Sequence, residues 1–180
     1  MNELTLLTVS GALRAGSTNR LLLAEAARVF GPATVVQADL HLPLYDGDLE
    51  DAQGIPDPAQ HLADQIRAAD AVVMSTPEYN KSLSGVLKNA LDWVSRVPGS
   101  VWRDKPVAIL SAADGRAGGE RAQFALRLCM VAFRPRLLAG PEVMVANSRT
   151  AFDAQGRLIE PRTVKGLTEL MQALRVEAMR

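Results

Sequence analysis

The sequence predicts an α/β fold in which a parallel sheet is covered by helices on both faces. Short, continuous apolar runs alternate along the chain with longer segments whose apolar residues recur at helical spacing. Gly and Pro residues separate many of these segments and mark turns. This alternation requires right-handed crossover connections between parallel strands, and such connections place helices on both faces of the sheet.

The predicted elements form five successive strand and helix pairs. The first strand, residues 4–10 (LTLLTVS), is an apolar run with β-branched content, as expected of a strand buried on both faces. The following helix, residues 19–30, carries Leu22, Ala26 and Val29 at helical spacing and ends before a Gly-Pro pair. The other strands are predicted at residues 34–39, 71–76, 106–112 and 142–146, the other helices at 58–70, 83–96, 120–133 and 163–178, and an exposed acidic turn segment at 46–58.

Length and composition are those of a single domain spanning residues 1–180, and 48% of the residues are apolar, enough for a sizeable core. The formal net charge is zero, which argues against electrostatic capture of nucleic acid and favours a small-molecule partner. The first apolar run is too short to span a membrane, and no cationic signal-peptide region precedes it. We therefore expect a cytoplasmic protein without a membrane partner.

The loop after the first strand, SGALRAGSTNR at residues 10–20, has the composition of an anion site. In doubly wound sheets, ligands bind outside the carboxyl ends of the strands. Ser17, Thr18 and Asn19 come at the start of the predicted helix, where their donors meet the positive end of its dipole. Arg14 adds a guanidinium that can hold a phosphate through two donors. The pattern suits a phosphomonoester, whereas helix capping by Ser17 or Asn19 is the purely structural alternative.

The third strand runs into TPEYNKSLSGVLKNALDW, which predicts a second ligand-facing loop. Pro77 has no backbone N–H and ends strand pairing, so Glu78, Tyr79 and Asn80 are presented at the same edge as the first loop. The Tyr79 ring offers a face to a planar ligand, and the neighbouring amides offer donors and acceptors to a heterocycle. An ordinary turn is the alternative interpretation.

The loop after the fourth strand, SAADGRAGGE at residues 111–120, contains three glycines that would let the backbone approach a ligand closely, or simply form a flexible turn. The first loop spells neither G-x-G-x-x-G nor G-K-[ST], which excludes the dinucleotide fingerprint and the P-loop. The only histidines are His41 and His61, and no metal-ligand spacing is present, so the chain lacks obvious hydrolytic machinery and a predicted metal site.

Taken together, these loops resemble the NADPH-dependent FMN reductase family, in its quinone and chromate reductase branch. The resemblance rests on SGALRAGSTNR, LPLYDGD, TPEYNKSLSGVLKNALDWVSR and GRAGGERAQ, and it extends from Leu4 to about Glu142. It implies a flavodoxin-like three-layer sandwich with a five-stranded parallel sheet of order 2-1-3-4-5 and noncovalently bound FMN. It assigns the FMN phosphate to Arg14, Ser17, Thr18 and Asn19, and the ring to Pro77, Glu78, Tyr79 and Asn80, with Ser111 and Gly115 nearby.

Two positions depart from the family pattern. Ala12 stands where relatives commonly carry the serine of G-S-L-R, and Ala113 stands where relatives often place a hydroxyl. We expect the missing hydroxyls to weaken FMN binding unless Ser10 or backbone amides compensate.

The resemblance implies an oxidoreductase whose chemistry is carried by FMN, without a catalytic side chain of its own. A hydride would pass from NAD(P)H to FMN. A quinone, a nitro or azo compound or a small oxidant such as chromate would then be reduced in the same cleft, by double displacement. Family members are typically homodimers or homotetramers. The alternatives are a reductase that releases reduced FMN, a flavodoxin-type electron carrier, which the zero net charge disfavours, and a domain without flavin.

Overall fold

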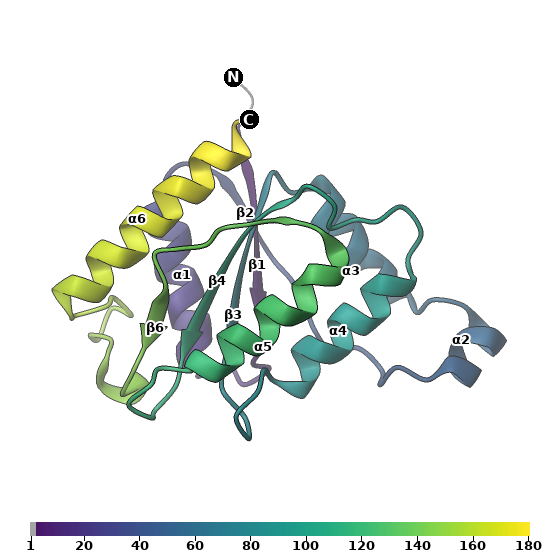
Figure 1. The fold of residues 1–180 in the computed structure, drawn as a ribbon, viewed down its shortest axis with the longest axis horizontal. Coiled ribbons are helices and arrows are strands. Elements are labelled where there is room, and N and C mark those ends of the chain that lie inside the picture. Colours follow the sequence, from purple (N-terminus) through teal and green to yellow (C-terminus); the bar gives the residue numbers. More distant parts are fainter. Residues whose placement is uncertain (1–2) are drawn as a thin grey trace.

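The computed structural model describes residues 3–180 and confirms the predicted parallel sheet between two layers of helices (Figure 1). The strands are β1 (Thr5–Ser10), β2 (Thr34–Gln37), β3 (Ala71–Thr76), β4 (Pro106–Ala112), β5 (Arg136–Leu137) and β6 (Val143–Val145). All pair in parallel in the order β2-β1-β3-β4-β5, and β6 pairs with the carboxyl half of β4. This is the predicted flavodoxin-like order, with a sixth strand added.

Helices cover both faces of the sheet, with α1 and α6 on one face and α3, α4 and α5 on the other (Figure 1). Their bounds are α1 (Thr18–Phe30), α2 (Gly47–Gln53), α3 (Asp57–Ala68), α4 (Gly85–Arg96), α5 (Glu120–Met130) and α6 (Pro161–Ala178), with short 3-10 helices η1 (Val131–Phe133) and η2 (Ser148–Thr150). Within residues 3–180, no helix combines the length and the apolar character needed to cross a membrane.

The sheet separates two hydrophobic cores because successive side chains of a strand point to opposite faces. On β3, Val72 and Met74 join the core beneath α3, α4 and α5, whereas Val73 joins the core beneath α1 and α6. Every residue of β3 and β4 is buried, as predicted for central strands that are covered on both faces. The carboxyl ends of β1, β3 and β4 are thereby held in register at one edge of the sheet.

Three local features differ from the sequence prediction. The segment expected to be an exposed turn contains α2, whose residues are all at least partly exposed and whose N-cap, Asp46, accepts a hydrogen bond from the Asp48 N–H. A strand that was not predicted, β5, pairs with the start of β4, and β6 pairs with its end. The segment between β5 and β6 includes Pro141, which has no N–H to donate to a strand ladder. Helix α5 ends at Met130, and the last predicted turn is the 3-10 helix η1.

Candidate functional site

The amino end of α1 presents free donors at the carboxyl edge of the sheet. Ser17 is the N-cap, and its Oγ accepts a hydrogen bond from the Asn19 N–H at 3.2 Å, which leaves the hydroxyl proton of Ser17 available to donate. Within residues 3–180, the backbone N–H groups of Gly16 and Thr18 have no hydrogen-bond acceptor. These donors lie at the positive end of the helix dipole, so the loop is built to receive an anion.

Arg14 supplies a full positive charge beside these donors. Its side chain is exposed, and among residues 3–180 no carboxylate lies within 4.0 Å of its guanidinium. The Arg14 Nε lies 3.9 Å from where a Cβ on Gly16 would stand, which places the guanidinium next to the loop. An unpaired arginine in this position favours a ligand that brings its own negative charge.

The structure gives the Asn19 side chain a role that its predicted assignment to the phosphate did not include. Asn19 is 2% exposed, and its Oδ1 accepts hydrogen bonds from Ser75 Oγ at 2.7 Å and from the Ala112 N–H at 3.0 Å. Its Nδ2 donates to the Ala112 carbonyl at 2.9 Å. One amide therefore ties the start of α1 to the carboxyl ends of β3 and β4, and all three bonds are made within the protein.

The loop after β3 forms the second wall of the site. Pro77 is buried, while the Tyr79 ring is 57% exposed. The Glu78 carboxylate accepts a hydrogen bond from the Arg121 N–H at 3.2 Å and lies 3.7 Å from the Arg121 Nη1, so this side chain anchors the first turn of α5. Asn80 occupies a left-handed turn with φ of 49° at the tip of the loop.

Close approach of the first two loops requires a glycine at position 11. A Cβ on Gly11 would stand 2.9 Å from Ser84 Oγ and 3.3 Å from Pro77 Cδ. Since contacts this short force a neighbour to move, any larger residue would push the β1 loop away from the β3 loop. The spacing of the two walls therefore depends on this position.

Two of the three glycines in the loop after β4, Gly118 and Gly119, serve packing within the protein, whereas a Cβ on Gly115 would meet nothing within 4 Å among residues 3–180. Gly119 has φ of 92°, and a Cβ there would stand 2.8 Å from the Cβ of Ser111. Gly118 has φ of 60°, and a Cβ there would stand 2.6 Å from the Met144 carbonyl carbon. The buried Ser111 Oγ donates to the Gly118 carbonyl at 2.6 Å and accepts from Gln123 Nε2 at 3.0 Å. These contacts, rather than a ligand, explain the close backbone approach that Gly118 and Gly119 permit.

A cleft of about 760 Å³ opens between these loops at the carboxyl edge of the sheet. Of the predicted binding residues, the cleft is lined by Arg14, Ser17, Thr18, Asn19, Pro77, Glu78 and Tyr79. The structure places Asn80, Ser111 and Gly115 outside its lining. Both alanines that depart from the family pattern, Ala12 and Ala113, lie on its wall.

Two further lining residues, Ser148 and Arg149, were not predicted. The Ser148 N–H donates to the Ala113 carbonyl at 3.2 Å, and the Arg149 Nε lies 3.2 Å from Asp114 Oδ2. Both residues follow β6, so the rule that ligands meet the carboxyl ends of strands could have found them. The residues directly after β6 contain no phosphate-loop or aromatic motif that would predict a binding role.

The donor set and the shape of the cleft fit a mononucleotide such as FMN. The volume lies within the range of about 300–1,000 Å³ typical of small-molecule sites. The acids on the wall, Glu78 and Asp114, are each paired with an arginine, whereas Arg14 has no acidic partner within residues 3–180. The cleft therefore carries an uncompensated positive charge at its α1 end and an exposed aromatic ring, Tyr79, on the opposite loop.

Comparison with known proteins agrees with this geometry. The NADPH-dependent FMN reductase family profile matches residues 4–150. An NAD(P)H-dependent FMN reductase of Pseudomonas aeruginosa is 43% identical over 177 residues, which cover 97% of this chain and 95% of that protein. A quinone reductase of Escherichia coli is 37% identical over 175 residues, which cover 95% of this chain and 93% of the relative.

Among solved structures, the flavoenzyme NAD(P)H:(acceptor) oxidoreductase of Paracoccus denitrificans superimposes with a TM-score of 0.86 at 28% sequence identity. The superposition covers 97% of each chain. The similarity therefore includes all three layers and the loops at the carboxyl edge of the sheet.

Proposed function

This chain belongs to the NADPH-dependent FMN reductase family and is an FMN-dependent NAD(P)H oxidoreductase, and we propose that it holds FMN in the 760 Å³ cleft and reduces quinones there. The observation that carries the assignment of the site is the unpaired Arg14 beside the free donors of Gly16, Ser17 and Thr18. No other part of this cleft, within residues 3–180, presents an uncompensated positive charge.

At the phosphate end, we assign charge neutralisation to Arg14 and hydrogen bonding to the Ser17 hydroxyl and to the N–H groups of Gly16 and Thr18. Ser10 does not replace the hydroxyl missing at Ala12, because its Oγ donates to the Ala12 carbonyl at 3.1 Å. Asn19 acts as a positioning residue, since all its side-chain bonds hold the strands that carry the loops. Phosphate binding therefore depends on few groups, so removing any one of them should lower the affinity for FMN.

At the ring end, the lining includes small and rigid residues beside an aromatic ring. Pro77, Ala112 and Ala113 present small or rigid surfaces, and the exposed Tyr79 ring stands at the cleft wall. FMN held here would supply the redox chemistry, a two-electron transfer from NAD(P)H to the acceptor. The ring of Tyr79 offers a planar quinone a surface on which to stack.

The cleft wall holds no unpaired carboxyl group or histidine among residues 3–180, because Glu78 and Asp114 are both engaged by arginines. A quinone that receives a hydride needs one further proton to become a hydroquinone. We infer that this proton comes from solvent through the open mouth of the cleft. The same openness is compatible with nitro and azo compounds and with chromate, which remain secondary acceptors in this proposal.

The experiment that tests this function mixes the FMN-loaded protein anaerobically with NADPH in a stopped-flow instrument, followed by a quinone. We expect the flavin absorbance to bleach with NADPH and to return with the quinone. Initial rates measured while both substrates are varied should give parallel reciprocal lines, because one cleft serves both substrates in turn. A flavin that stays oxidised with NADPH, or lines that intersect, would contradict the proposal.

A second function, supply of free reduced flavin to another enzyme, is favoured by one observation. Ala12 and Ala113 leave two positions on the cleft wall without hydroxyls, so FMN is held by fewer side-chain donors than in typical relatives. Gel filtration of the FMN-loaded protein separates the two cases. Flavin that elutes with the protein supports the quinone reductase, whereas flavin that is lost during the run supports release.

We also propose that the protein forms a homodimer or a homotetramer through α5. Phe124, Leu128 and Val131 are 50%, 75% and 71% exposed, and their spacing puts them on one side of the helix and its 3-10 extension. A row of exposed apolar side chains marks an association surface more often than an isolated one does. The first turn of α5 also holds Glu78, so a second copy at this helix would flank the cleft.

Leu128→Glu should therefore weaken self-association, because it places a charge in the middle of the row. Sedimentation velocity should show a fall in mass relative to wild type, with FMN binding unchanged. Leu44→Glu is the matched control, since Leu44 is 81% exposed but lies before α2, away from α5. A monomeric wild type, or equal masses for wild type and Leu128→Glu, would contradict the interface.

A further inference from the structure

A second cleft lies at the amino ends of the strands, at the other end of β4 from the 760 Å³ cleft proposed to hold FMN, called the FMN cleft below. It is formed by the end of α4, by residues 97–103 and by residues 132–134, and it has a volume of about 510 Å³. The segment 97–103 leads to the first residue of β4, Pro106, whereas the FMN cleft is lined by the last residue, Ala112. A strand of this length spans about 20 Å, so the two clefts are separate.

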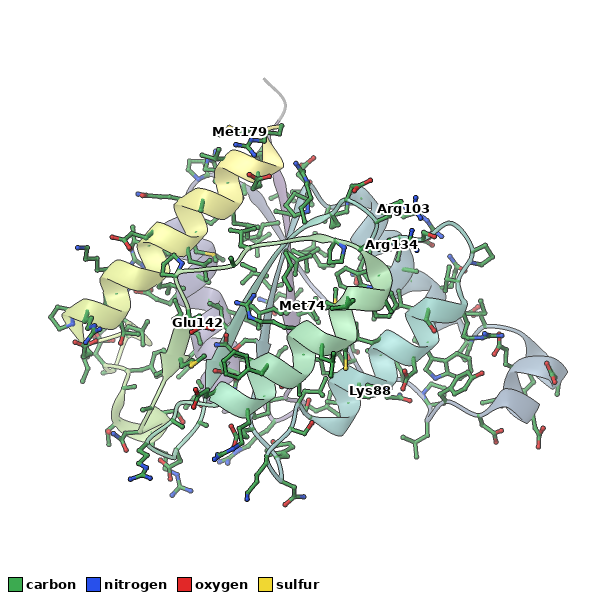
Figure 2. All side chains as sticks on the ribbon, viewed as in Figure 1. Met74, Lys88, Arg103, Arg134, Glu142 and Met179 are labelled. Carbon is green, nitrogen blue, oxygen red and sulfur yellow. The ribbon has the colours of Figure 1, made fainter. Side chains whose placement is uncertain are left out.

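Among residues 3–180, every charged residue that lines this second cleft is an arginine. The lining includes Arg96, Arg103 and Arg134 and no carboxylate. Arg96 is paired with Glu50 at 2.9 Å, but Arg103 and Arg134 have no acid within 4.0 Å among residues 3–180, although Asp104 follows directly in the chain. Figure 2 shows Arg103 and Arg134 near one another at the same end of the molecule.

Helix dipoles reduce this positive charge but do not cancel it. Both α4 and α5 with η1 end at this cleft, and each helix end contributes about −0.5 of a charge at most. Arginines near helix ends often serve only to balance such dipoles. Here, however, two unpaired guanidinium groups face about one negative charge, so the cleft keeps a net positive charge of about one.

Trp102 is a buried residue of this cleft whose indole N–H has no acceptor among residues 3–180. It is 3% exposed. The other tryptophan, Trp93, donates its Nε1 hydrogen to the Pro43 carbonyl at 2.8 Å. Buried donors are rarely left without an acceptor, so Trp102 requires an explanation.

The same residue also gives the cleft an apolar wall. The Trp102 and Phe133 ring centroids are 6.3 Å apart, and Val97 and Val101 complete the surface. Cations beside an aromatic and aliphatic wall together match a ligand that has an anionic head and an apolar body.

We propose that this cleft binds a small organic acid, with its carboxylate between Arg103 and Arg134 and its apolar part against Trp102 and Phe133. This site does not depend on the proposed function, because none of its residues lines the FMN cleft.

The test uses the FMN-loaded protein labelled with ¹⁵N and follows the two indole N–H signals during titration with benzoate. Trp102→Phe identifies which signal belongs to Trp102. We expect benzoate to shift the Trp102 signal in a saturable manner and to leave the Trp93 signal in place. Benzamide, which has the same ring without the charge, should shift the Trp102 signal far less.

Variants then test the arginines directly. Arg103→Gln and Arg134→Gln should each weaken benzoate binding about tenfold, because each removes a charge-assisted contact. Arg162→Gln, an exposed arginine on α6, is the matched control and should leave the titration unchanged. No shift with benzoate, equal shifts with benzamide, or unchanged affinity in both arginine variants would overturn the proposal. Both arginines are exposed, and circular dichroism verifies that the variants are folded.

Discussion

Replacing Asn19 with alanine should cost about 3–5 kcal/mol of folding stability, because three buried groups lose their only side-chain partner at once. The Ser75 hydroxyl and the N–H and carbonyl groups of Ala112 would each be left without the Asn19 amide in a site from which water is excluded. Each such orphaned group costs about 1–3 kcal/mol. For a chain of this size, the melting temperature should fall by roughly 10 °C.

Asn89→Ala is the matched control for this variant. Asn89 also bridges two backbone groups, the Tyr45 N–H at 2.8 Å and the Pro43 carbonyl at 2.9 Å, but it is partly exposed. Water can replace its amide, so we expect a loss of about 1 kcal/mol or less. Urea unfolding of the FMN-free proteins measures both changes. If Asn19→Ala and Asn89→Ala lose similar small amounts, Asn19 does not hold the strand ends together.

The double variant Arg14→Gln/Ser17→Ala should lower the affinity for FMN on the order of 100-fold or more. Removing a charged donor to a phosphate costs about 1.5–3 kcal/mol of binding free energy, and removing a neutral hydroxyl donor costs about 0.5–1.5 kcal/mol. Arg14 has no acidic partner within residues 3–180, so its loss removes ligand binding without breaking an internal ion pair. Quenching of FMN fluorescence by the flavin-free protein measures the dissociation constant.

Two further variants show whether the lower FMN affinity comes from the lost phosphate contacts. Arg162→Gln removes an exposed arginine that does not line the cleft and should leave the dissociation constant unchanged. Arg14→Gln alone should account for most of the loss, while thermal unfolding shows how much of the effect of Ser17→Ala comes from weakening α1. A double variant that binds FMN within threefold of wild type would show that the phosphate is held elsewhere.

The fold was predictable from the sequence to a large extent because its determinants are local. Continuous apolar runs and helical spacing are recognised within a few residues, and they predicted five of the six strands and five of the six longer helices that residues 3–180 form. The exceptions are α2, which contains no fully buried residue, and β5, which has two residues. Neither element is long or apolar enough to leave a periodic pattern.

The residues of the proposed anion site could be picked out from the sequence for the same reason. Arg14, Ser17 and Thr18 lie within five residues of one another, and their position before a helix defines their role. By contrast, the partners of Asn19 are 56 and 93 residues away, and Arg149 reaches the cleft from the end of β6. The structure also assigns Gly119 and Gly118 to packing against Ser111 and Met144, which no local pattern indicates.

The sequence by itself determined the layered fold and the grouping of donors at the proposed phosphate site, since these depend on periodicity and on residues that are neighbours along the chain. Only the tertiary structure decided which side chains are free to bind. Asn19 and Glu78 are bound by partners within the protein, whereas Arg14, Arg103 and Arg134 have no acid within 4.0 Å in the part of the chain that the structure describes. Whether a polar group is available depends on what the fold brings next to it from distant segments, and that information is absent from any short stretch of residues.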